Sequence, residues 1–122
     1  MSKKARWERD RARAEALAQG QSVPMLAGAL CGRLALDGRR DDSVGLAQLF
    51  TDAGLVDAAA DATIDVERGV DLAERETQTT LAAALVLRLL ADGSTLDAHR
   101  LVALFSATNV GAGDYASLVP SA

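Results

Sequence analysis

The chain has little of several residues on which particular folds and chemistries depend. Its 122 residues include one cysteine, Cys31, and one histidine, His99. These counts exclude an internal disulfide and a metal site built on two histidines. No apolar run approaches the length of about 18 residues that a membrane-spanning helix needs, and the first residues are charged rather than arranged like a secretion signal. We therefore expect a protein of the cytoplasm, or of a particle assembled there, with no membrane contact.

Residues that favour β-strands are also scarce. Aromatic residues make up 3% of the chain and isoleucine occurs once, whereas Ala and Leu together occupy 43 of the 122 positions. Ala and Leu are strong helix formers, and strands favour β-branched and aromatic residues. The sequence therefore predicts an all-α fold, and its length predicts a single helical domain over residues 1–122.

The chain aligns with itself at an offset of 55 residues, which is the mark of an internal repeat. Positions 22–50 match 77–105 without a gap, and 12 of these 29 positions are identical. The identical pairs are Leu26/Leu81, Ala27/Ala82, Ala29/Ala84, Leu30/Leu85, Arg33/Arg88, Leu34/Leu89, Asp37/Asp92, Gly38/Gly93, Asp42/Asp97, Leu46/Leu101, Leu49/Leu104 and Phe50/Phe105. A shared helical period explains matched leucines, but not Arg, Asp, Gly and Phe in one register. We therefore predict a tandem duplication with internal repeats at 10–54 and 65–109.

Each repeat is predicted to form three helices, about six in all. The first and second helices are expected at about 3–19 and 22–36 in one repeat and at about 57–75 and 77–91 in the other. Each third helix follows an Asp-Gly pair, in which glycine supplies the left-handed residue that ends the helix before it. Ser94 and Asp97 fit a capping box at the start of the last helix. The glycine-rich tail, 110–122, is predicted to form a short strap over the body or over a partner.

The second helix of each repeat is predicted to form the core. It is apolar on nearly every side except at Arg33 or Arg88, which indicates burial on most sides. We expect these two helices to pack across a pseudo-twofold axis, because a single repeat is small for a stable core of its own. Arg33 and Asp37, and likewise Arg88 and Asp92, lie four residues apart on one helical stripe. We interpret each pair as a structural clasp, in which Arg offsets Asp and reaches carbonyls of a neighbouring helix end.

The two equivalent first helices differ in charge. Residues 2–19 carry six basic and three acidic side chains, a net charge of +3, whereas residues 57–74 carry one basic and six acidic side chains, a net charge of −5. Three interpretations stay open. The two helices face each other within the chain, or the basic helix of one molecule meets the acidic helix of the next, or both faces are simply solvated. Pairs four residues apart on the basic helix also indicate intrahelical stabilisation, namely Lys4–Glu8, Arg6–Asp10 and Arg11–Glu15.

An aromatic residue near the end of the basic helix needs either a packing site or a partner. Trp7 stands among arginines, and Trp and Arg are the residues that most often anchor protein interfaces. The tail adds further apolar side chains. The candidate interaction residues are therefore Arg6, Trp7, Arg9, Arg13, Tyr115 and Leu118.

The residue types that carry catalysis are not arranged for it. Cys31 lies in an apolar helix and His99 is predicted on the outer face of another, so no nucleophile has a base beside it. The repeated Asp-Gly turns are not calcium loops, because a loop with Gly38 or Gly93 at its sixth position would begin with an arginine. The sequence predicts no enzyme, no metal and no cofactor.

These features together indicate a non-catalytic helical subunit for protein–protein interaction or assembly, an adaptor or a structural component of a larger complex such as a phage particle. A protein partner or self-association is expected. The alternative is a nucleic-acid-binding accessory protein that uses residues 3–13, although residues 20–122 carry seven basic and 14 acidic groups, which oppose a broad contact with phosphates. A second alternative is an acidic inhibitor protein that uses the acidic helix.

Overall fold

Six α-helices and one short 3-10 helix make up the part of the chain that the computed structural model describes, which is residues 2–52 and 62–120, with side chains described for 2–52 and 69–120. The elements are α1 (Lys3–Gly20), α2 (Val23–Leu36), α3 (Arg40–Asp52), α4 (Ala62–Arg75), α5 (Gln78–Ala91), α6 (Thr95–Thr108) and η1 (Tyr115–Leu118). No strand occurs among these residues, so the prediction of an all-α fold is confirmed. The start expected for the fourth helix, residues 57–61, lies outside the described residues.

Side-chain caps and turn glycines set the helix boundaries. Ser22 and Thr77 accept hydrogen bonds from the backbone N–H groups of Met25 and Thr80, which otherwise lack partners in the first turn. After α2 and α5, Gly38 and the equivalent Gly93 adopt φ of +80° and +82°. Glycine has no Cβ to oppose this conformation. The expected capping box at Ser94 is wrong, because Ser94 precedes α6 but its side chain makes no capping hydrogen bond.

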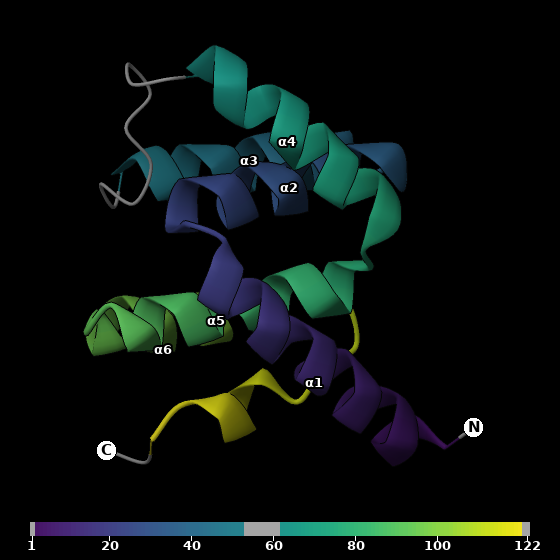
Figure 1. Ribbon diagram of the computed structural model, residues 1–122, viewed down its shortest axis with the longest axis vertical. Coiled ribbons are helices and arrows are strands. Elements are labelled where there is room, and N and C mark those ends of the chain that lie inside the picture. Colours follow the sequence, from purple (N-terminus) through teal and green to yellow (C-terminus); the bar gives the residue numbers. More distant parts are fainter. Residues whose placement is uncertain (1, 53–61, 121–122) are drawn as a thin grey trace.

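The helices pack in a crossed pattern between the two halves of the chain. α1 packs on α5 and α4 packs on α2, while α2 and α5 contact each other in the middle. Helix α3 adds to α2, and α6 adds to α5. As Figure 1 shows, α4 and α1 therefore lie at the two ends of the long axis. Since each packs mainly on the second helix of the opposite half, the interpretation that α1 and α4 face each other is wrong.

The two central helices carry the core, as their apolar sequences predict. Leu30 and Leu85 are fully buried, and Leu26, Leu34, Leu81 and Leu89 are at most 1% exposed. Burying a leucine side chain contributes about 1.5–3 kcal/mol relative to leaving it in water. The core therefore depends on both halves at once.

Small residues allow the close crossing of α4 over α2. A Cβ atom placed on Gly32 would lie 3.2 Å from Cβ of Ala73, and one on Gly69 would lie 3.5 Å from the backbone nitrogen of Ala29. Side chains larger than these would separate the two helices, because buried contacts leave few voids to absorb extra atoms. Gly32 of α2 and Gly69 of α4 thus determine how closely the two helices approach.

The C-terminal tail lies across the second half of the chain. Helix η1 contacts α5 and α6, and the Tyr115 hydroxyl donates a 2.7 Å hydrogen bond to the carbonyl oxygen of Val110. Tyr115 also packs edge-on against Phe105, with 5.3 Å between ring centroids. The strap predicted from the sequence covers the chain's own body.

Candidate interaction surface

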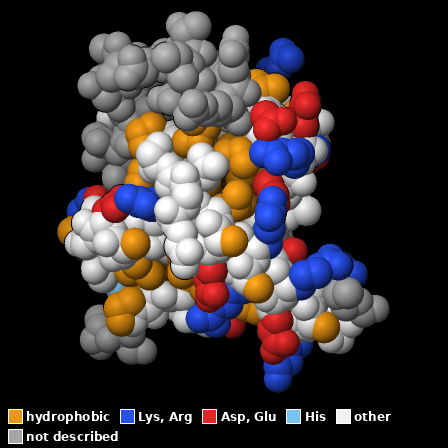
Figure 2. All heavy atoms as spheres, in the orientation of Figure 1, with side chains coloured by type: hydrophobic (Ala, Val, Ile, Leu, Met, Phe, Trp, Pro, Cys, Tyr) orange, Lys and Arg blue, Asp and Glu red, His pale blue; other side chains and the backbone are white. Residues whose placement is uncertain are grey.

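Helix α1 presents its basic side chains to solvent. Its inner positions, Ala14, Leu17 and Ala18, are buried against the body, and Trp7 is half-buried. Since these positions fall on one side of the helix, the remaining sides carry the charges. The exposed basic residues of α1 are Lys3, Lys4, Arg6, Arg9, Arg11 and Arg13. Lys and Arg side chains accordingly cover the N-terminal end of this helix, at the lower right of Figure 2.

Two of the six form ion pairs within the chain. Arg13 Nη2 lies 2.6 Å from Oε1 of Glu76, whose side chain is only 8% exposed, and Arg11 pairs with Glu15 at 3.4 Å. Arg13 therefore has a structural role, because a buried carboxylate left without its partner is costly.

We define the basic turns as Lys3, Lys4, Arg6 and Arg9. None of the four forms an ion pair with another residue whose side chain is described. The Lys4–Glu8 and Arg6–Asp10 pairs expected from spacing are therefore absent within 4.0 Å. Of the other arginines whose side chains are described outside α1, Arg33, Arg39, Arg75, Arg88 and Arg100 pair with carboxylates, whereas Arg40 does not.

Lys3 and Lys4, which lie in the first turn of α1, also oppose the dipole of their own helix. The first turn of α1 contains no acidic residue, and the N-terminal end of a helix carries a partial positive charge. Each cation placed there costs about 0.3–1 kcal/mol of helix stability relative to a favourable charge. The positive charge of Lys3 and Lys4 therefore does not serve the stability of α1.

The three apolar candidate residues pack against the chain's own body, where Tyr115 and Leu118 are buried and Trp7 is partly buried. Tyr115 is 4% exposed and Leu118 is 8% exposed, both within the core. Trp7 packs edge-on against Tyr115, with 5.9 Å between ring centroids. A Cβ atom on Gly113 would lie 2.6 Å from the Trp7 ring. The tail itself therefore provides a packing site for Trp7, and the expectation that these residues meet a partner stays a prediction. Burial raises the pKa of Tyr115 to about 12.

One arginine of each central helix binds the helix that packs on it: Arg33 of α2 binds α4, and Arg88 of α5 binds α1. Arg33 donates through Nε and Nη2 to Asp37, and through Nη1 to the carbonyl oxygen of Ala73 at 3.0 Å. Arg88 donates in the same way to Asp92, and through Nη1 to the carbonyl oxygen of Ala18 at 3.2 Å. Both carbonyls belong to the last turn of a helix, where the negative end of the dipole favours a cation.

Arg39 makes a further contact between the halves that sequence reasoning missed. Its Nη2 donates to the carbonyl oxygen of Thr108 at 2.6 Å, and its Nη1 to that of Asn109 at 2.8 Å. It thereby binds the C-terminal end of α6. Nothing in the sequence singled out Arg39, because the residue 55 positions later is Ser94 and not an arginine.

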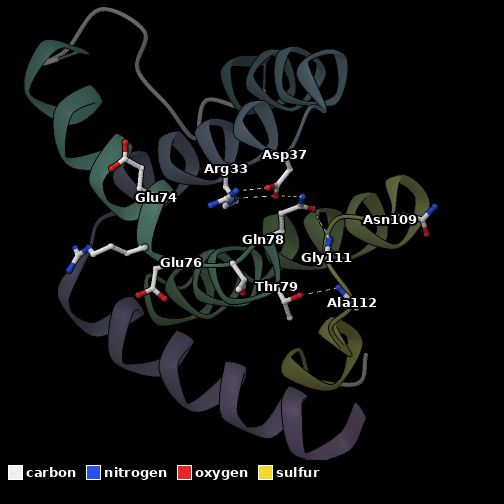
Figure 3. A pocket seen from close by; sticks show the side chains of 11 residues that line it. Arg33, Asp37, Glu74, Glu76, Gln78, Thr79, Asn109, Gly111 and Ala112 are labelled. Atoms are coloured by element: carbon white, nitrogen blue, oxygen red, sulfur yellow. Dashed lines mark hydrogen bonds and ion pairs between the residues drawn. The ribbon is translucent and has the colours of Figure 1, made fainter. Parts of the chain in front are cut away.

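A polar cleft of about 630 Å³ lies where α2, the α4–α5 turn and the tail meet (Figure 3). Its groups largely bond one another. Gln78 donates to Asp37 and accepts from the backbone nitrogen of Gly111, and Thr79 accepts from that of Ala112. The remaining lining residues are Arg33, Glu74, Arg75, Glu76, Thr77 and Asn109. Hydrogen bonds that stabilise the fold therefore fill much of the cleft. Its lining includes Thr77 and Thr79 but no histidine that would activate their hydroxyls as nucleophiles.

The one cysteine and the one histidine of the chain do not line this cleft. Cys31 is part of α2, and burial raises the pKa of its thiol to about 11, so the thiol stays protonated at neutral pH. His99 lies in α6. Among the residues whose side chains are described, no group of three His, Cys, Asp or Glu is placed to hold a metal ion.

Comparison with protein-family models, with curated proteins and with solved structures finds no match for the chain. None of the helices searched in the described residues is both long and apolar enough to cross a membrane.

Proposed function

We propose that the protein is a non-catalytic interaction or assembly subunit, which works in the cytoplasm or in a particle assembled there and binds a protein partner through the basic turns of α1. We propose also that it arose by tandem duplication and packs around a pseudo-twofold axis. The single observation that carries the function is the group of four exposed cations near the start of α1 that have no ion-pair partners among the described side chains. The first two of them, Lys3 and Lys4, also oppose the dipole of the helix. Charge that does not serve folding is available for a partner.

The repetition of local structure supports the duplication. α2 and α5 begin and end at positions 55 residues apart, since 78 − 23 and 91 − 36 are both 55. The turn after each contains the same 2.8 Å backbone hydrogen bond, from Arg39 to Leu34 and from Ser94 to Leu89. Many helices that end at a glycine form this turn, so the shared helix bounds are the main support.

The exchange of contacts between the halves supports the pseudo-twofold axis. Arg33 reaches Ala73, and Arg88 reaches Ala18. The two arginines lie 55 residues apart, and so do the two alanines, since 88 − 33 and 73 − 18 are both 55. Reciprocal contacts of this kind are what a twofold axis produces, because residue i meets j wherever j meets i.

Nucleic-acid binding is the second candidate, and the basic turns are the observation that favours it. Lysine and arginine neutralise phosphates irrespective of sequence. The rest of the chain opposes this function, because residues 20–122 carry a net charge of −7, from seven basic and 14 acidic side chains. We therefore place protein binding first.

Charge reversal of the basic turns tests the proposal. The variant R6E/R9E removes the central charges of the turns, and the matched control R40E/R100E makes the same change in net charge at two exposed arginines of α3 and α6. We expect the wild type and the control to be recovered from their own cells in a discrete protein complex, and R6E/R9E to be recovered without it. A complex that survives R6E/R9E, or a wild type recovered alone, would contradict the proposal. Nuclease-sensitive recovery would support the second candidate instead.

A further inference from the structure

We propose that the partner of the basic turns is the outer face of α4 in a second copy of the chain, so that molecules associate head to tail. The outer face is defined here by Val70, Asp71 and Glu74. This inference rests on the proposed function and names its partner.

The outer face of α4 is both acidic and apolar. Gly69, Leu72 and Ala73 are buried against α2, so the neighbouring positions point away from the body. Val70 is 48% exposed and is one of five large apolar side chains that are exposed among the described residues. Asp71 and Glu74 lie beside it and are exposed. Among the described side chains, Asp71 forms an ion pair with Arg75 at 2.8 Å, and Glu74 forms none.

The two surfaces are complementary in charge. The basic turns carry four positive charges, and the outer face of α4 carries the negative charges of Asp71 and Glu74, of which Asp71 pairs with Arg75. The exposed small side chains of α1, Ala5, Ala12 and Ala16, leave room for a second helix to approach between the charges. Opposite potentials of this kind raise association rates and select the partner. A nucleic acid would meet the same cations but would also meet the negative charge of the remaining chain.

The arrangement of the helices prevents this contact within one molecule. α1 packs on α5 and α4 on α2, and the two helices lie at opposite ends of the long axis (Figure 1). The contact must therefore join different molecules. Because the two surfaces differ, the contact is heterologous, and it leaves a free basic surface at one end of each pair and a free acidic surface at the other. Further copies add at these ends, to form a chain or a closed ring.

The first experiment is sedimentation velocity of the purified full-length chain at about 50 mM and about 500 mM salt, because screening shortens the reach of exposed charges from about 14 Å to about 4 Å over this range. We expect the average mass at low salt to rise with protein concentration beyond the 12.7 kDa of one chain, and to return to that value at high salt. A single-chain mass under every condition would overturn the inference.

The second experiment swaps the charges. K3E/K4E/R6E/R9E makes all four positions of the basic turns acidic, and D71K/E74K makes the outer face of α4 basic. Each variant alone is expected to remain a single chain, because its two surfaces then have the same sign. An equimolar mixture is expected to associate again, because the acidic α1 of one variant meets the basic α4 of the other. R40E/R100E is the control and should associate like the wild type. The six reversed residues are exposed, so circular dichroism spectra should match the wild type. Where D71K/E74K fails to fold, D71N/E74Q replaces it and should weaken association at least threefold.

The outcomes separate this inference from the proposed function. A mixture that fails to associate, or association that survives D71K/E74K, means that α4 is not the partner surface. A wild type that stays a single chain but is recovered with a different protein through its basic turns overturns only the inference. A wild type that binds neither itself nor another protein overturns both.

Discussion

Replacing Arg88 by methionine tests how the crossed packing is held together. The substitution keeps much of the apolar stem but removes the guanidinium, whose Nη1 donates to the carbonyl oxygen of Ala18 at 3.2 Å and whose Nε and Nη2 contact Asp92. A hydrogen bond to a charged group contributes about 1.5–3 kcal/mol, and an ion pair four residues apart about 0.3–0.5 kcal/mol. Because the side chain of Arg88 is 31% exposed, we take the lower part of this range and expect a loss of about 1.5–2.5 kcal/mol.

The thermal midpoint converts this loss into a measurement. An unfolding entropy of about 2.1 cal/mol/K per residue corresponds, for a chain of this size, to about 4 °C per kcal/mol. We therefore expect R88M to lower Tm by about 6–10 °C in calorimetry, and R33M to lower it by a similar amount because Arg33 makes the equivalent contacts. The control is R100M, whose arginine is 68% exposed and reaches Asp97 only at 3.6 Å, and which should change Tm by less than about 2 °C. Equal effects of R88M and R100M would refute the reasoning.

Three further predictions concern single residues. Gly45→Ala in α3 should raise Tm by about 2–4 °C, since no atom outside the local helix lies within 4 Å of the added Cβ, whereas Gly38→Ala should lower Tm by about 4–8 °C because of its φ of +80°. Cys31, with a pKa of about 11, should react with a thiol reagent at pH 8 about 100-fold more slowly than in urea, where its pKa returns to 9.0. The hydrogen bond from Arg33 lowers the pKa of Asp37 below 3.8 in the folded state. The ionised carboxylate of Asp37 therefore stabilises the fold fully above pH 3.8, and this stabilisation is lost as the pH falls through the pKa of the folded state. Urea midpoints measured from pH 5 down to about 2 should therefore decline less steeply for Asp37→Asn.

Local features of the fold could be predicted from the sequence, because local chemistry determines them. The apolar runs around Leu30 and Leu85 identify the buried helices, and Gly38 and Gly93 identify the turns that follow them. The crossed packing could not be predicted in detail. The pairs of helices that pack together are determined by the fit between surfaces distant in sequence, such as Gly32 against Ala73.

The same distinction applies to the candidate surface. The positive charge of residues 2–19 is a property of composition and could be predicted. The position of Trp7 against the tail could not, because an aromatic side chain indicates a need for burial but not where burial occurs. Its packing site depends on Gly113 and Tyr115, more than 100 residues away. Arg39 was missed for a similar reason, since its partners are backbone carbonyls of α6.

If the chain arose by tandem duplication, the crossed packing explains how it became electrically polar without losing its fold. Each first helix is held by inward residues, such as Leu17 in α1 and Leu72 in α4, and by an arginine from the opposite half. Outward positions contact nothing in the body, so substitutions there change charge at little cost in stability. If α1 and α4 began as copies, opposite substitutions on their outer faces would leave equivalent packing and opposite charge at the two ends of the molecule. Such a particle attracts its own kind along one axis, and this attraction is what the charge-swap experiment measures.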